Sequence, residues 1–219
     1  MQEAAGPLAF VPGPLAGLAE AEEERLMRSL GFRRYGRSEM VLDGLSPPAE
    51  GPLGAGETLR PVVRDDLAAL ATLHRAAYRN RFDRYLFLEL ADEEEDAVRE
   101  VREILDGRWG EFLPRGSWIL LDGGSPTGAV LTVHGGAGAL VADVMVDPAR
   151  QGRGVGRRVL TRAVQEMRAG GETRIYLNVT EGNDRALRLY RALGFVRSLG
   201  PTKDWYNAAR IPVPPSPSA

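Results

Sequence analysis

The most informative stretch of the chain reads DPARQGRGVGRR and runs from Asp147 to Arg158. It follows a mostly apolar run, residues 139–146, that predicts a strand, and it leads into residues 153–169, whose pattern predicts a helix. Glycines at such a junction permit a tight turn and let backbone N–H groups approach an anion closely. The first turn of a helix adds unpaired N–H donors and the positive end of the helix dipole. The stretch therefore predicts a phosphate-binding turn.

The spacing of the glycines disfavours two common nucleotide loops. The dinucleotide pattern G-x-G-x-x-G, counted from Gly152, needs glycine where Arg157 stands, and the count from the next glycine fails as well. The Gly-Lys-Ser/Thr of a nucleoside-triphosphate loop is also missing from the stretch. The pattern that does occur is Q-x-x-G-x-G, at Gln151, Gly154 and Gly156. An NAD-linked enzyme is therefore disfavoured.

A second motif, N-x-x-A-x-x-L-Y-x-x-x-G-F, runs from Asn183 to Phe195. With both motifs in this order, the chain resembles the GCN5-related N-acetyltransferase (GNAT) superfamily over residues 57–206. The resemblance implies an α/β (α+β) fold, in which a mixed central sheet with splayed central strands carries helices on both faces. It also implies acetyl-CoA as the cosubstrate and no requirement for a metal.

The resemblance further implies which residues hold acetyl-CoA. The backbone of Val144, Met145 and Val146 would pair with the pantetheine arm, while their side chains fill the core. Asn183 would contact the pantetheine or phosphate end, or alternatively cap the helix that follows it. The residues that would wrap the pyrophosphate, chiefly through backbone amides, are Gln151, Gly152, Arg153, Gly154, Val155, Gly156 and Arg157.

The resemblance assigns catalysis to Tyr190, which matches the family tyrosine that protonates or hydrogen-bonds the departing CoA thiolate. The alternative is a helix tyrosine that fills core space. For the general base we expect Asp143, a carboxylate on a strand among apolar neighbours, with Glu181 and His134 as alternatives. The acidic run 92–96 would attract a cationic amine or, as charge runs usually do, form a solvated helix N-terminus.

The composition narrows the class of protein. A formal net charge of −2 over 219 residues gives no electrostatic case for a nucleic-acid partner. No apolar run approaches the length of a membrane span, and the absence of cysteine fits a reducing cytoplasm. Two histidines and no cysteine do not favour a metal site. All but one of the 28 basic residues are Arg, which points to a coding bias, so arginine clusters carry less functional weight than usual.

The chain divides by composition into three regions. Residues 57–206 hold the alternating strand and helix signals of the acetyltransferase domain. Residues 207–219 form a Pro/Ser tail that is expected to be disordered. Residues 1–56 enclose a predicted helix at 17–30 between Gly/Pro-rich stretches.

The N-terminal region repeats part of the domain. RLMRSLGF at residues 25–32 matches RLYRALGF at residues 188–195, with Met27 in the place of Tyr190. We predict a remnant of a second GNAT-like copy without its own cofactor site, the alternative being chance similarity. The residues after Phe32 predict a pair of short strands. These strands would add to the sheet of the domain or shape a subunit contact, which would make a homodimer.

The sequence favours an N-acetyltransferase that transfers an acetyl group from acetyl-CoA to an unidentified primary amine, on a small molecule or a peptide, by direct attack. The alternative is a non-catalytic CoA-binding or acyl-CoA-binding sensor or interaction module. The presence of Tyr190 favours the enzyme. A cleft closed by the N-terminal segment would favour the binding module.

Overall fold

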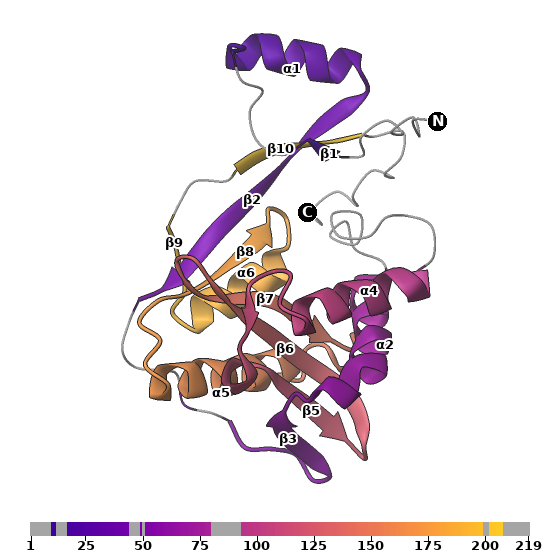
Figure 1. The fold of residues 1–219 in the computed structure, drawn as a ribbon, viewed down its shortest axis with the longest axis vertical. Coiled ribbons are helices and arrows are strands. Elements are labelled where there is room, and N and C mark those ends of the chain that lie inside the picture. The colour runs from indigo at the N-terminus through magenta and orange to yellow at the C-terminus, as the bar shows by residue number, and fades with distance from the viewer. Residues whose placement is uncertain are drawn as a thin grey trace.

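The computed structural model describes residues 10–11, 17–43, 49, 51–79, 93–198 and 202–207. In this part of the chain, ten strands form one sheet (Figure 1). The strands are β1 (Phe10–Val11), β2 (Phe32–Leu42), β3 (Glu57–Pro61), β4 (Glu111–Phe112), β5 (Trp118–Asp122), β6 (Ser125–Gly135), β7 (Gly138–Val146), β8 (Ile175–Thr180), β9 (Val196–Arg197) and β10 (Thr202–Asn207). The helices are α1 (Glu20–Ser29), α2 (Leu67–Tyr78), α4 (Glu93–Leu105), α5 (Val155–Ala169) and α6 (Asp184–Ala192).

The sheet is mixed, as the sequence predicts. Its order is β1-β10-β2-β8-β7-β6-β5-β3, with β4 beside β6 and β9 beside β2. Neighbouring strands run antiparallel, except that β7 and β8 run parallel. A parallel pair needs a crossover, and α5 supplies it between β7 and β8.

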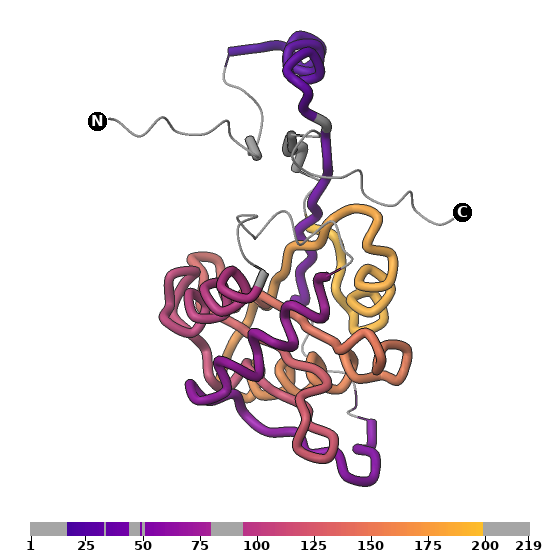
Figure 2. Tube along the Cα trace, turned by 90° about the vertical axis from the view of Figure 1, so that its right-hand side faces the viewer, coloured from indigo at the N-terminus to yellow at the C-terminus, as the bar shows by residue number. Residues whose placement is uncertain are grey.

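Helices cover both faces of the sheet (Figure 2). On one face, α5 and α6 pack on a core that includes Leu160, Met167 and Phe195. On the other face, α2 and α4 pack on a second core that includes Leu70, Ile104 and Met145. Apolar side chains therefore alternate between the two faces along the central strands, which confirms the predicted architecture.

The two parallel strands separate after a short contact. β7 and β8 pair only from Ala139 to Val141 and from Ile175 to Leu177, although β7 continues to Val146 and β8 to Thr180. Ala142 is an extra residue in β7, because the register with β6 shifts there. Such a bulge bends its strand and increases the local twist. The predicted splay of the central strands is therefore present.

The N-terminal segment contributes a central strand. The sequence predicts a pair of short strands after Phe32, and this prediction is wrong: β2 is a single strand of 11 residues. Its second half, Arg37–Leu42, pairs with β8 along one edge, and β9 and β10 pair along its other edge. Met40, Val41 and Leu42 are buried. Burial on both faces and pairing on both edges favour one continuous strand over a hairpin.

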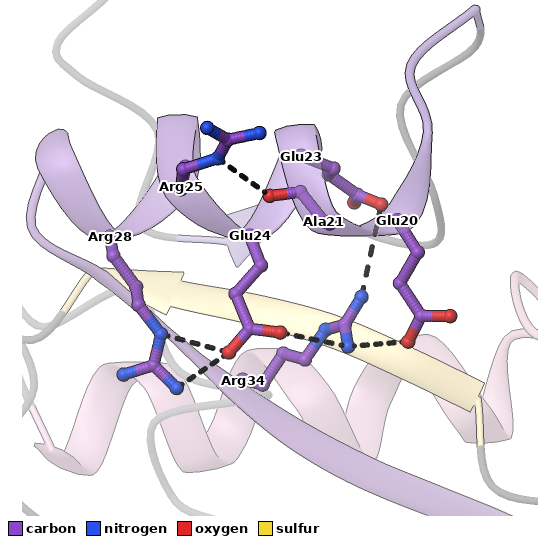
Figure 3. A network of polar contacts seen from close by, with 7 residues as sticks. All are labelled: Glu20, Ala21, Glu23, Glu24, Arg25, Arg28 and Arg34. Carbon is purple, nitrogen blue, oxygen red and sulfur yellow. Dashed lines mark hydrogen bonds and ion pairs between the residues drawn. The ribbon is translucent and has the colours of Figure 1, made fainter.

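The first half of β2 and helix α1 extend beyond the body of the domain (Figures 1 and 2). Figure 3 shows how α1 is attached there by charge. Arg34 of β2 reaches three carboxylates of α1, at 2.9 Å from Glu20, 3.6 Å from Glu24 and 3.9 Å from Glu23. Glu23 and Met27 form the buried side of α1. A network around one arginine gives more orientation than an isolated surface pair.

The predicted N-terminal helix is present. The helix expected at 17–30 is α1, and β5 and β6 are joined by a turn at Gly123 and Gly124, both with positive φ. The expected tail, residues 207–219, lies outside the described residues apart from Asn207, which ends β10.

We expect Met40→Ala to lower the free energy of unfolding by about 2–4 kcal/mol, because Met40 is 1% exposed and its loss leaves a cavity beside β8. Leu26→Ala on α1 is the control, since Leu26 is 43% exposed, and it should change stability by less than about 0.5 kcal/mol. Urea denaturation of both variants checks this. Equal effects would show that β2 does not belong to the cooperative core.

Candidate active site

A cavity of about 270 Å³ opens between the diverging ends of β7 and β8. Val144 and Val146 line it from β7, and Asn178 and Thr180 line it from β8. The cavity extends from the glycine turn at the start of α5 to the end of α2 at Tyr78. It is therefore a groove between strands, with a turn rich in backbone donors at one end.

The glycine turn sets where α5 begins. Gly154 is the N-cap of α5 with φ +77°, a conformation that L side chains rarely adopt. For this reason α5 begins at Val155, two residues after the start that the sequence predicts. Gly156 lies where a Cβ would approach Val146 Cγ2 to 3.2 Å and Leu189 Cδ2 to 3.3 Å. The first turn of α5 is thus held close to β7 and α6, with its amides at the cavity.

The structure places most of the predicted cofactor residues on this cavity. Six of the seven residues of the turn line it, namely Gln151, Gly152, Gly154, Val155, Gly156 and Arg157. Arg153 is not among the lining residues, and its carbonyl accepts a hydrogen bond from Arg158. The side chain of Met145 is fully buried in the core beneath α2 and α4.

Arginines gather around the phosphate end of the groove. Arg150, Arg157 and Arg185 line the cavity beside the glycine turn. Arg150 is paired with Asp122 at 2.9 Å, and Arg185 donates a hydrogen bond to the side chain of Gln151. The turn is therefore surrounded by positive charge in addition to its backbone donors.

Helix α6 brings two predicted residues to the cavity. Tyr190 is buried, lines the groove, and has its ring 6.0 Å from that of Phe195. Asn183 also lines the groove and is the N-cap of α6, where its side chain accepts a hydrogen bond from the amide of Ala186 at 3.3 Å. The N-cap interpretation of Asn183 is confirmed, and its contact with a ligand stays a prediction.

Asp143 lines the groove from β7 and contacts α2. Its Oδ1 accepts a hydrogen bond of 2.6 Å from the hydroxyl of Tyr78. Its Oδ2 is 3.6 Å from Nε2 of His74, and the same Nε2 is 3.6 Å from Oε2 of Glu100 on α4. Asp143, His74 and Glu100 are 7%, 1% and 7% exposed, so three ionisable groups share a buried space.

Burial changes the protonation of two of these groups. It raises the pKa of Glu100 to about 9, and the negative charge of Asp143 adds to this effect. Burial also lowers the pKa of His74, against a smaller opposite effect of Asp143. At neutral pH, Glu100 is therefore a neutral carboxylic acid and His74 a neutral imidazole.

The structure separates the three candidate bases. Glu181 accepts hydrogen bonds from Ser38 and Arg197, and it does not line the groove. His134 lies 3.5 Å from Glu172 with half of its side chain exposed, and it does not line the groove either. Of the three, Asp143 is the one that the fold brings to the groove.

The acidic run at the start of α4 resembles a solvated helix N-terminus. Glu94 and Glu95 are exposed, and Glu94 pairs with Arg75 at 3.3 Å. Asp96 is buried and pairs with Arg99 at 2.5 Å. None of these three acids lines the groove, and Asp92 lies outside the described residues.

Sequence reasoning missed the partners of Asp143. His74 and Tyr78 lie one helical turn apart on α2, and their rings are 4.6 Å apart. That spacing was visible in the sequence as a polar and an aromatic residue on the apolar face of the helix. Glu100 lies on the inner face of α4, where a charged residue interrupts the apolar stripe. Both signals needed the fold to be connected with Asp143.

The site is a groove between splayed parallel strands, and a glycine turn at the start of a helix, with its backbone N–H donors, lines it. The model of the family described as "Acetyltransferase (GNAT) family" matches residues 68–195, which are more than half of the chain. The chain therefore belongs to the acetyltransferase (GNAT) family.

Individual relatives agree with this family. A mycothiol acetyltransferase from Kineococcus radiotolerans is 34% identical over 167 residues, which are 74% of this chain and 50% of that protein. The N-alpha-acetyltransferase RimI from Mycobacterium tuberculosis is 44% identical over 69 residues, 32% of this chain and 41% of that protein. The chain thus spans half or less of these curated relatives.

Solved structures share the fold. A GCN5-related N-acetyltransferase from Sphaerobacter thermophilus superposes with a TM-score of 0.64 at 19% identity, over 85% of this chain and 56% of that chain. Within the described ranges, no helix is long and apolar enough to cross a membrane. In the same part of the chain, no group of three or more His, Asp or Glu side chains is arranged to hold a metal ion.

We expect Glu100→Gln to stabilise the protein more at high than at low pH. The Glu100 carboxyl ionises near its ordinary pKa of 4.5 in the unfolded chain but only at about 9 in the folded one. Between these values the folded state holds the extra proton, so wild-type stability falls as pH rises, by up to about 1.4 kcal/mol per pH unit. The glutamine side chain does not ionise, so the variant loses this pH dependence of stability. Denaturation at about pH 5.5 and about pH 8 tests it, and an equal effect of the substitution at both would contradict a neutral Glu100.

Proposed function

We propose that the protein is an acetyl-CoA-dependent N-acetyltransferase. One observation carries the proposal: the glycine turn of α5, Tyr190 and Asp143 all line the groove between β7 and β8. The lining of the groove, which combines backbone donors with two side chains that can exchange a proton, fits a ligand that carries both phosphates and a reactive group. The name of the family supports acetyl transfer.

The residues of the groove fit acetyl-CoA. The amides of the turn, from Gln151 to Arg157, would bind the pyrophosphate together with the positive end of the α5 dipole. The backbone of Val144, Met145 and Val146 on β7 would pair with the amides of the pantetheine arm, because β8 has diverged from this edge. Asn183 would contact the pantetheine while it caps α6.

Two side chains face the reactive end. Bound acetyl-CoA supplies an acetyl thioester that an unprotonated amine attacks directly. Tyr190 would donate its hydroxyl proton to the leaving sulfur, since a phenol is a suitable acid for a thiolate. Asp143 would remove the proton from the acceptor ammonium, directly or through one water.

The acceptor is a primary amine on a small molecule or a peptide. Two relatives are named a mycothiol acetyltransferase and an N-alpha-acetyltransferase, so amines related to mycothiol and alpha-amino groups belong among the acceptors to test. Thiol release from acetyl-CoA, measured over peptides, amino acids, polyamines, antibiotic amines and deacetylated mycothiol, tests the proposal. Bound CoA without turnover on any amine would support the non-catalytic binding module instead.

The N-terminal segment, residues 1–56, fits a remnant of a second GNAT-like copy in front of the domain at 57–206. Helix α1 ends shortly before Gly31, which has a φ of +83°, and β2 follows. Helix α6 ends in the same way shortly before Gly194, which has a φ of +91°, and β9 follows. This shared succession supports the proposal beyond the matching letters. β2 joins the sheet of its own chain, so this contribution needs no second subunit.

We expect Tyr190→Phe to lower kcat by roughly a hundred-fold, because the thiolate loses its proton donor. The KM for acetyl-CoA should change little, since the ring remains in place. Tyr176→Phe, on β8 but not among the residues that line the groove, is the matched control and should keep wild-type kcat. Steady-state kinetics of the two variants decides, and an unchanged kcat in Tyr190→Phe would remove this tyrosine from the mechanism.

We expect Gly154→Ala to weaken CoA binding about ten-fold, or about 1.4 kcal/mol, because alanine resists the positive φ that aims the first-turn amides. Gly171→Ala provides the control. It lies just beyond the other end of α5 with φ +94° and imposes the same kind of strain away from the groove. Calorimetric titration with CoA should show a near wild-type Kd for Gly171→Ala. Equal losses in both variants would argue against binding at the turn.

A further inference from the structure

A buried ionisable cluster lies behind the acceptor side of the groove. It joins Asp143 of β7, His74 of α2 and Glu100 of α4, three elements that meet only in the folded protein. Burying ionisable groups costs free energy, so a cluster of this kind beside a cleft is a candidate functional site.

The protonation states determine which group of the cluster carries a negative charge. Glu100 is neutral at neutral pH, because burial raises its pKa to about 9. The imidazole of His74 is neutral as well, since burial lowers its pKa. Asp143 is therefore the carboxyl group in the cluster that can offer a negative charge to an imidazole N–H.

The position of the imidazole proton follows from hydrogen-bond accounting. Among the described residues, none hydrogen-bonds Nδ1 of His74, so a proton on that nitrogen would be buried without an acceptor. Nε2 faces Oδ2 of Asp143 at 3.6 Å. The tautomer with its proton on Nε2 is therefore favoured, and the contact can shorten when a substrate binds, as catalytic hydrogen bonds often do.

We propose that His74 is a positioning residue for Asp143: its neutral Nε2–H, together with the hydroxyl of Tyr78, fixes the carboxylate that accepts the proton of the acceptor ammonium. The inference rests on the proposed acetyl transfer. In the step it serves, an N–H bond of the ammonium breaks and an O–H bond forms on Asp143, and the proton leaves to water after the amide product departs. His74 keeps its own proton throughout.

The use of neutral donors has a chemical reason. Tyr78 donates to Oδ1 at 2.6 Å, and the neutral imidazole faces Oδ2, so both of these contacts come from uncharged groups. A cationic partner would stabilise the ionised carboxylate and weaken it as a base. The neutral state of Glu100 completes the arrangement, because a second carboxylate would compete with Asp143 for the imidazole N–H.

Other charged groups of the described residues lie near the cluster. On α4, Glu103 and Asp96 raise the pKa of Glu100 and Arg99 lowers it, all less strongly than burial does. From β2, Arg37 lines the groove that Asp143 also lines.

Nuclear magnetic resonance of the full 15N-labelled chain tests the proposed interaction between His74 and Asp143 in the absence of any acceptor amine. The chain has two histidines, so His134→Gln assigns the signals of His74. We expect the Nε2–H tautomer and a His74 midpoint below the ordinary 6.5, which falls further in Asp143→Asn because a raising charge is lost. Glu100→Gln should leave this midpoint unchanged. An Nδ1–H tautomer, or a midpoint insensitive to Asp143→Asn, would overturn the proposal.

Kinetics test the consequence for catalysis. His74→Phe should lower kcat/KM roughly ten-fold and move the acid limb of its pH profile to higher pH, because the ionised carboxylate loses a donor. His74→Gln, whose amide can still donate, should restore most of the activity and the limb, and His134→Gln should match wild type. An unmoved limb in His74→Phe would leave only a structural role. Absence of thiol release by the wild type on every amine would instead defeat the proposed function, and the resonance measurement would still decide on His74.

Discussion

Three residue pairs between β7 and β8 determine the rest of the site. The strands pair from Ala139 to Val141 and from Ile175 to Leu177 and then separate, although both continue. Their outer edges remain held, by β6 along β7 and by β2 along β8. Because the outer partners persist where the inner pairing stops, the separation is a fixed feature of the sheet. The groove, the glycine turn and the two catalytic candidates all lie along it.

The N-terminal segment is part of this arrangement. β2 pairs with the whole of β8, including Val179 and Thr180 at its diverging end. It also carries Arg37 to the groove and buries Met40 in the core shared with α5 and α6. A segment that looked surplus to the domain therefore supports one wall of the groove. The charge network between α1 and Arg34 then fixes the helix above the first half of the strand.

The sequence was informative where local chemistry determines the structure. The backbone at position 154 has a positive φ, which glycine adopts readily, and α5 begins directly after it. Asn183 caps α6 because its side chain reaches a first-turn amide. The sequence does not reveal the structural features that depend on tertiary contacts. Nothing local shows that Glu100 meets His74, or that β2 runs on as one strand because β8, β9 and β10 pair with both of its edges. Such contacts join residues far apart in the chain, and periodicity alone does not reveal them.

The proposed site requires that CoA lies between β7 and β8 with its phosphates at the turn of α5. Amide hydrogen exchange of the full chain, with and without saturating CoA, tests this placement. We expect slower exchange for backbone amides from Gly152 to Arg157 and from Val144 to Val146, with exchange in α1 unchanged. CoA that binds while exchange in both stretches stays the same would contradict it.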